Sequence, residues 1–263
     1  MIIWLSSYPK NGNTWLRSLI SSYYYTKDGL FLGDKQLQNI QQFPTKKFME
    51  NFDYDLKKPG DTVKYWIKAQ EKINLDNKIK FFKTHHVMCN LGKNSFTNYE
   101  NTFGVIYIVR DPRNIITSIL NYYSKKNYEE AKEFLFDEGR IIGVDLSKKY
   151  EYENDNNIIT LISSWKNHYN SWKNFKKNYL LIKYENLISK PDNEFRKISN
   201  YISKLINISF EEKIINNAIK TNDFENLKNI ERENGFVEAT KDHETGKTKK
   251  FFNLGPKNNW RNI

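Results

Sequence analysis

The sequence contains one cysteine, Cys89, and no apolar run near the length of about 18 residues that a membrane-spanning helix needs. A single cysteine excludes an internal disulfide bond and favours a reducing compartment. The apolar run at residues 2–5 has no charged segment before it, so we interpret it as a core strand and not as a signal peptide. These absences predict a cytoplasmic protein without a membrane span.

Acidic residues are in deficit, because 31 Asp and Glu stand against 42 Lys and Arg, and the formal net charge is +11. A basic excess suits a polyanionic partner, such as nucleic acid, anionic lipid or a multiply phosphorylated small molecule. The basic residues are nevertheless spread along the whole chain with acidic residues between them, as on an ordinary solvated surface. Since no basic arm or nucleic-acid motif is present either, we expect no nucleic-acid partner.

Strand-like and helix-like segments alternate along the chain. We expect strands at 2–6, 80–85, 104–109 and 179–184. We expect helices at 14–24, 62–72, 114–123, around 165–172, and near 191–205 and 209–219. This alternation predicts an α/β fold, a single domain over residues 1–263 with a central parallel β-sheet flanked by helices. Two polar stretches, 125–157 and 237–250, are expected to be a mobile excursion and a flexible tail.

The loop between the first strand and the first helix, residues 7–13, has the features of an anion site. The first-turn N–H groups of a helix have no intrahelical partner, and the helix dipole favours negative charge there. Gly12 allows a close backbone approach, Lys10 adds a positive charge, and Asn13 and Thr14 add side-chain donors. The alternative is a plain surface turn.

The loop is not a nucleoside-triphosphate P-loop, because the pattern G-x-x-x-x-G-K-[ST] is absent and Lys10 precedes the glycine. No acidic strand end clearly supplies a magnesium ligand. We therefore expect a phosphate-bearing ligand that needs no metal.

Lys83 and His85 lie two residues apart on the second expected strand, so their side chains point the same way. Together they can serve as a cation and a base, whereas His86 points away. The alternative is a surface run of polar residues.

Arg110 follows the most apolar strand, and Ser118 comes eight residues later in the next helix. Arg110 can form charge-assisted hydrogen bonds to a phosphate, and Ser118 can donate to the same group. The alternative for Arg110 is an ion pair with Asp111 or another carboxylate.

These segments resemble signatures of the cytosolic and bacterial sulfotransferases that use 3′-phosphoadenosine 5′-phosphosulfate (PAPS). The matching segments are 8–15 (YPKNGNTW), 83–85 (KTH), 107–118, 184–187 (YENL) and 252–262. They come in the family's order and cover nearly the whole chain. The resemblance implies a P-loop NTPase-like sulfotransferase fold and an enzyme that transfers a sulfuryl group from PAPS to a hydroxyl or amine, releasing 3′-phosphoadenosine 5′-phosphate (PAP).

The resemblance also implies donor-binding roles, residue by residue. The 5′-phosphosulfate would be bound by Lys10, Asn11, Gly12, Asn13 and Thr14. The adenine would stack on Trp15, with Tyr184 and Phe224 at its edge and other face, although ordinary core packing is the alternative for Trp15 and Phe224. The 3′-phosphate would be held by Arg110 and Ser118, and Gly255 keeps the family's pattern in the tail.

For the transfer itself, the resemblance implies in-line attack without a metal. His85 would be the general base, because its unperturbed pKa of about 6.5 leaves it neutral near pH 7. Lys83 would steady the transferring group, and Lys10 would neutralise charge on the bridging oxygen.

The sequence departs from the family pattern at four positions. Asn11 and Asn13 replace the usual serine and threonine, and Asn253 and Leu254 replace an arginine and a lysine that contact the 3′-phosphate. The lysines that are candidates to compensate are Lys249, Lys250 and Lys257.

Two other functions are compatible with these residues. A P-loop nucleotide kinase or related phosphotransferase would require ATP and magnesium. A non-catalytic module would bind a nucleotide or an acidic glycan without turnover. The acceptor, a small molecule or a glycan, is not encoded in a recognisable motif, and we expect its loops at 26–61, 86–100 and 125–160; the oligomeric state stays open.

Overall fold

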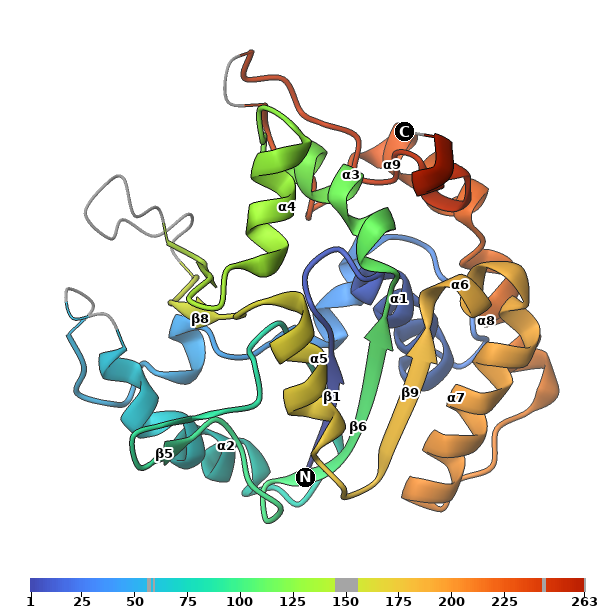
Figure 1. Ribbon diagram of the computed structural model, residues 1–263. Helices are drawn as coiled ribbons and strands as arrows, with labels where there is room; N and C mark the ends of the chain where they lie inside the picture. Colours follow the sequence, from blue (N-terminus) through green and yellow to red (C-terminus); the bar gives the residue numbers. More distant parts are fainter. Residues whose placement is uncertain (56–57, 59, 145–155, 243–244, 263) are drawn as a thin grey trace. The chain divides into compact units, whose positions relative to one another are not determined.

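The computed structural model describes residues 1–55, 58, 60–144, 156–242 and 245–262 (Figure 1). The chain divides into two compact units, each made of three segments. The first unit comprises Met1–Pro9, Gln41–Tyr107 and Phe136–Leu181. The second unit comprises Lys10–Ile40, Ile108–Leu135 and Ile182–Ile263. The expectation of one domain over 1–263 stays a prediction.

A five-stranded sheet has the order β2-β3-β1-β6-β9. Its strands are β1 (Ile2–Ser6), β2 (Gln41–Gln42), β3 (Lys80–Thr84), β6 (Thr102–Val109) and β9 (Tyr179–Lys183). β1 pairs in parallel with β3 and β6, and all five of its residues are buried, which explains its continuous apolar sequence. The predicted α/β fold with a central parallel sheet is confirmed, although β3 ends at Thr84, one residue before His85.

The remaining elements of the first unit are short. Its helices are α2 (Trp66–Asn74) and α5 (Trp165–Lys173), with 3-10 turns at Lys46–Phe48 and Asp61–Tyr65. Two small antiparallel pairs are formed by β4 (Asn90–Leu91) with β5 (Asn94–Ser95) and by β7 (Ile141–Ile142) with β8 (Thr160–Leu161).

Aromatic side chains form the core of the first unit. Trp4 of β1 packs against Phe96 and against Trp172 of α5, with ring centroids 5.6 and 6.5 Å away. Phe96 also contacts Trp66 of α2 at 5.5 Å. Large rings thereby attach α2 and α5 to the sheet, and α5 crosses in front of β1 in Figure 1.

The second unit is mainly helical. Its helices are α1 (Asn13–Tyr25), α3 (Pro112–Tyr122), α4 (Tyr128–Phe136), α6 (Tyr184–Ser189), α7 (Pro191–Ile206), α8 (Glu212–Thr221) and α9 (Phe224–Asn234). Its 3-10 turns lie at Asp34–Asn39, Gly255–Lys257 and Trp260–Asn262.

Two helices differ from expectation. Helix α4 lies in the stretch expected to be a mobile excursion, and it buries Ala131, Phe134 and Leu135, which are spaced along one helical face. The charged residues between them hid this pattern. The part of the excursion at 145–155 lies outside the described residues. Helix α9 was likewise not predicted.

The tail expected to be flexible is held by specific contacts. Lys241 and Thr248 form an isolated antiparallel bridge, and the Lys249 ammonium donates to the Asn121 carbonyl at 2.7 Å. The Asn121 carbonyl lies 128 residues from Lys249 in the sequence, so local composition did not reveal this contact. Residues 243–244 of this tail are outside the described part.

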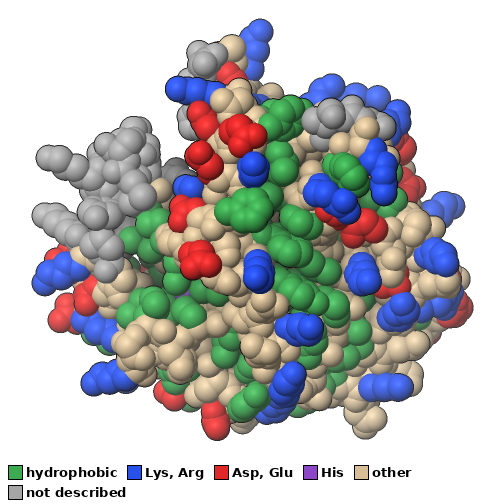
Figure 2. All heavy atoms as spheres, in the orientation of Figure 1, with side chains coloured by type: hydrophobic (Ala, Val, Ile, Leu, Met, Phe, Trp, Pro, Cys, Tyr) green, Lys and Arg blue, Asp and Glu red, His purple; other side chains and the backbone are tan. Residues whose placement is uncertain are grey.

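Figure 2 shows how charged side chains are distributed over one face of the molecule. On the face drawn in Figure 2, Lys and Arg side chains are spread singly, with Asp and Glu among them. In the described part of the chain, every helix is too short or too polar to cross a lipid bilayer.

Candidate active site

The donor loop joins β1 to α1 through two residues in the left-handed region, Lys10 (φ 66°) and Gly12 (φ 97°). Gly12 precedes α1 and brings no side chain to the helix end, and the first turn contains no acidic residue. A Cβ at this position would lie 2.4 Å from a ring carbon of Tyr184. Only glycine fits there, and the amino end of α1 keeps its affinity for an anion.

Asn11 anchors the loop. Its side chain is buried, and Nδ2 donates to the carbonyl of Ile108 in β6 at 3.3 Å. Among the described residues its Oδ1 has no hydrogen-bond partner. The replacement of serine by asparagine therefore gives the loop a side-chain tie to the sheet's carboxyl edge.

The Lys10 ammonium faces two aromatic rings. It lies 3.8 Å from the centroid of Tyr122 in α3 and 4.4 Å from that of Phe251 in the tail. Cation–π attraction of this kind favours this position of the ammonium and limits the freedom of the side chain. Neither ring was identified from the sequence.

Arg110 and Ser118 come together as expected. Nη1 of Arg110 lies 3.4 Å from the Ser118 hydroxyl and donates to the Lys10 carbonyl at 3.3 Å. Its guanidinium lies 4.3 Å from the centroid of the Tyr184 ring and is 6% exposed. Burial lowers the pKa of Arg110, and within the described structure its Nε has no hydrogen-bond partner. A buried guanidinium with a donor to spare suits an anionic ligand.

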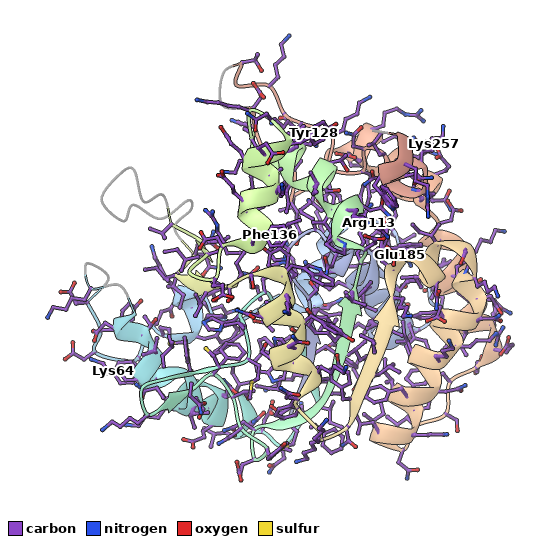
Figure 3. The ribbon with its side chains drawn as sticks, viewed as in Figure 1. Lys64, Arg113, Tyr128, Phe136, Glu185 and Lys257 are labelled. Atoms are coloured by element: carbon purple, nitrogen blue, oxygen red, sulfur yellow. The ribbon has the colours of Figure 1, made fainter. Side chains whose placement is uncertain are left out.

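Among the described residues, Asp111 forms its ion pair with Arg113 and not with Arg110, which was the suggested partner. The Asp111 carboxylate caps α3 by accepting from the Arg113 N–H at 2.9 Å, and it pairs with the Arg113 guanidinium at 2.6 Å. The Asp111 N–H donates to Glu185 at 2.9 Å, so Arg113 and Glu185 both lie at the start of α3 (Figure 3). The Asp111 carboxylate is thus bound to Arg113, and the Glu185 carboxylate accepts from the Asp111 backbone.

The aromatic residues assigned to adenine lie at the edge of a small core. Trp15 and Phe224 are partly buried and pack against a cluster of Phe31, Leu37, Leu227, Phe236 and Phe252. The Trp15 ring meets Tyr184 edge-on, with centroids 5.9 Å apart.

Gly255 is a second position where a nearby aromatic ring, that of Phe224, leaves no room for a side chain. Gly255 has φ 50°, and a Cβ there would lie 2.0 Å from the Phe224 ring. The pair Gly255–Phe224 repeats the relation between Gly12 and Tyr184. Both glycines therefore let backbone lie directly against a ring proposed to contact adenine.

The residues assigned to catalysis, Lys83 and His85, belong to the first unit. Lys83 is buried in β3, and His85 follows the strand end. The Nδ1 atom of His85 lies 2.8 Å from the carbonyl oxygen of Ser7 and 3.3 Å from its hydroxyl. A carbonyl oxygen only accepts, so Nδ1 carries the proton and the lone pair resides on Nε2. This is the tautomer that a base requires.

His86 has a different environment, in line with the expectation that it points away. Its ring is stacked on Phe96 at 4.4 Å with an interplanar angle of 3°. Burial lowers the pKa of His86 to about 4, so it is neutral and structural.

A family model described as a sulfotransferase domain matches residues 2–263. The chain belongs to the sulfotransferase family. No curated protein sequence matches it significantly.

Solved structures support the same fold for this sulfotransferase. A mouse sulfotransferase complexed with PAP is 19% identical, and the match covers 99% of this chain and 78% of that one with a TM-score of 0.55. Retinol dehydratase complexed with androsterone and PAP is 15% identical, covering 99% of this chain and 75% of that one with a TM-score of 0.57. The same enzyme complexed with retinol and PAP is 16% identical, and the match covers 99% of this chain and 75% of that one with a TM-score of 0.57.

In the sulfotransferase tail, Asn258 docks the chain onto α3. It accepts from the Thr117 hydroxyl at 2.9 Å and donates to the Asn114 carbonyl at 2.7 Å. Lys249 is tied to Asn121 and pairs with Asp242 at 3.3 Å. The other two candidate lysines, Lys250 and Lys257, are exposed, and Lys257 is drawn in Figure 3.

Two functional candidates were missed by sequence reasoning. The first is Glu238, whose carboxylate accepts from the Thr14 hydroxyl at 2.5 Å and forms an ion pair with Arg17. The Thr14 hydroxyl, which was assigned to the phosphosulfate of PAPS, thus already donates to a carboxylate in this structure. Glu238 lies 224 residues from Thr14 in the sequence, and no local pattern marks it.

The second missed residue is His168 in α5, which is fully buried beside His85 in the first unit. A signal for it did exist, because it lies four residues before the core residue Trp172 and so shares its helical face.

Proposed function

We propose that this sulfotransferase uses PAPS as its donor and transfers the sulfuryl group to a hydroxyl or amine of a small-molecule acceptor. The observation that carries the proposal is Arg110, a buried guanidinium beside Ser118 and the donor loop with an Nε donor to spare. Solved relatives complexed with PAP support the same donor.

Donor binding would rest on fixed positive groups of the second unit. Arg110 and Ser118 would hold the 3′-phosphate, and Lys10, Asn13, Thr14 and the amino end of α1 would hold the 5′-phosphosulfate. The Thr14 hydroxyl donates to the Glu238 carboxyl group, which supports its proposed role as a donor to the oxygens of the phosphosulfate. The bound donor supplies an activated sulfuryl group.

Catalysis would divide between charge and proton transfer. Lys10 would neutralise charge on the leaving 5′-phosphate, and Lys83 would steady the sulfuryl oxygens. His85 would take the acceptor's proton at Nε2, and the resulting imidazolium would keep its Nδ1–H bond to the Ser7 carbonyl. Ser7, whose carbonyl accepts from His85, lies three residues before Lys10 in the chain.

Among small-molecule acceptors with a hydroxyl or an amine, the solved relatives favour alcohols. Androsterone and retinol, bound by the solved relative retinol dehydratase, are both alcohols. A screen with radiolabelled PAPS against phenols, alcohols, sugars and amines would rank the acceptors by transferred label.

The donor is tested by thermal unfolding with added nucleotide. PAP should raise the melting temperature strongly, because a ligand at 100 times its Kd stabilises a protein by roughly 2.7 kcal/mol. AMP and magnesium-ATP should do much less, and EDTA should leave sulfuryl transfer unchanged. If magnesium-ATP stabilised the protein as strongly and phosphate were transferred in an EDTA-sensitive reaction, the kinase alternative would replace this proposal. Binding of PAP without turnover of any acceptor would instead favour the non-catalytic module.

We also propose that residues 1–263 act as one sulfotransferase domain in the cytoplasm. The single thiol, Cys89, is partly buried, and burial raises its pKa to about 11, which keeps it unreactive. Cell fractionation with an antibody would test the location, and coincident unfolding transitions of the two units would test the single domain.

A further inference from the structure

The first unit contains a buried histidine that the proposed mechanism does not use. His168 is 0% exposed, yet each of its ring nitrogens has a polar partner. Nδ1 lies 2.8 Å from the Tyr107 hydroxyl, and Nε2 lies 3.1 Å from the carbonyl oxygen of His85.

These partners define one tautomer of His168. The His85 carbonyl only accepts, so Nε2 carries the proton, and Nδ1 then accepts from the Tyr107 hydroxyl. Burial lowers the pKa of His168 to about 3 and raises that of Tyr107 well above its usual range. Both groups therefore keep their protonation states near neutral pH, and the direction of both hydrogen bonds is fixed.

Helix α5 holds the main chain of the segment that carries the base. The ring N–H groups of His168 and Trp172 donate to the carbonyl oxygens of His85 and His86, at 3.1 and 2.9 Å. The Ser171 hydroxyl accepts from the backbone N–H of Met88 at 3.1 Å. Side chains spaced along one helix thus fix the backbone that follows β3.

We propose that His168 is a positioning residue for sulfuryl transfer, because its hydrogen bond to the His85 carbonyl fixes the backbone from which the base projects. The Ser7 carbonyl holds the ring of His85, and His168 holds its main chain. With both anchors, the lone pair on Nε2 has one direction. The inference rests on the proposed role of His85 as the base.

The first test removes the ring N–H of His168 that donates to the His85 carbonyl and keeps a side chain of similar size. In His168→Phe, kcat should fall about 10- to 100-fold, since a misplacement near 1 Å costs up to that much. The Kd for PAP should stay unchanged, because the proposed donor-binding residues lie in the second unit. His168→Gln should recover part of the rate, since its amide N–H can donate to the same carbonyl. Activity is measured with radiolabelled PAPS and the fastest acceptor of the screen above.

A double-mutant cycle separates positioning from a general structural role. In a His85→Ala background, His168→Phe should have little further effect on kcat, because there is no base left to position. An equal fold-loss in both backgrounds would overturn the inference while leaving the base assignment intact. Normal activity of His85→Ala alone would overturn the base assignment and the inference with it.

Trp172→Phe provides the matched control, since it removes the same kind of hydrogen bond one turn along α5 but from the carbonyl of His86. It should lower the melting temperature at least as much as His168→Phe and reduce kcat less. Equal losses of kcat would contradict the specific role of His168. If His168→Phe fails to fold, Tyr107→Phe tests the same chain, with a smaller loss of kcat expected and the same disappearance in the His85→Ala background.

Discussion

Buried basic side chains differ in charge between the proposed donor region, around Arg110, and the proposed base region, around His85. In the second unit, Arg110 is 6% exposed and stays charged, because a guanidinium cannot lose its proton under protein conditions. In the first unit, His86 and His168 are buried to the same degree or more, and burial lowers their pKa to about 4 and 3. The proposed donor region would therefore rely on fixed charge, whereas the proposed base region would rely on fixed tautomers.

The difference suits the two tasks. Phosphate oxygens need a charge that persists at every pH, and in the proposed site Arg110 would supply it together with the backbone of the donor loop. A general base needs a lone pair in a known direction, which neutral hydrogen-bonded rings can define. Variants in one region should thus leave the other region's function intact.

The largest effect is expected for His85→Ala. Loss of a general base should reduce kcat by about two to four orders of magnitude. The Kd for PAP should stay within a factor of about two, because the proposed donor-binding groups remain. Stopped or continuous assays with radiolabelled PAPS measure the rate, and calorimetry measures the binding. Near-normal turnover of the variant would show that another group takes the proton.

Lowering the pH from about 6.5 to 4 should reduce the free energy of unfolding through His86 and His168, whereas Arg110 stays charged throughout this range. The folded pKa values of His86 and His168 lie below the unfolded value near 6.5, so the unfolded chain binds more protons between about pH 6.5 and 4. The stabilisation is fully present above pH 6.5 and is lost as the pH falls towards the folded pKa values. Each histidine should remove about 1.4 kcal/mol of unfolding free energy per pH unit in this window.

Urea unfolding at several pH values between 7 and 4.5 measures this slope. The acid Asp242, whose pKa is lowered to about 2, loses its contribution below this window and does not confuse it. His168→Gln should roughly halve the slope because one titrating ring is gone. A variant with the full slope would locate the acid sensitivity elsewhere.

For the donor region, Arg110→Ala should weaken binding of PAP by about 10- to 100-fold, since hydrogen bonds to charged groups contribute about 1.5–3 kcal/mol. Binding of AMP, which lacks the 3′-phosphate, should change far less. Isothermal titration with both nucleotides makes the comparison. Equal losses for the two ligands would remove Arg110 from the 3′-phosphate site, and Arg113→Ala, whose guanidinium pairs with Asp111, is the control.

The sequence indicated that Arg110 and Ser118 lie close together but did not indicate the contacts of His168 or Glu238, because of how far apart the partners lie in the chain. Arg110 and Ser118 are eight residues apart, so one strand end and one helix bring them together. His168 reaches its partners Tyr107 and His85 across 61 and 83 residues, and such pairings depend on how α5 packs on the sheet. Glu238 is farther still from Thr14. Local patterns report periodicity and turn chemistry, but they do not report which distant side chain completes a hydrogen bond.

The last prediction separates backbone shape from charge and concerns Gly12. Gly12→Ala should cost roughly 1–3 kcal/mol of stability from its positive φ, and more from the Cβ that would meet Tyr184 at 2.4 Å. Gly235→Ala is a matched control, since Gly235 also has a positive φ (73°) but a Cβ there would meet nothing within 4 Å. Both variants should lose stability in chemical denaturation, and only Gly12→Ala should also weaken PAP binding, because Tyr184 lies against both Gly12 and Arg110. Equal behaviour of the two variants in both measurements would mean that the close contact at Gly12 has no part in shaping the donor site.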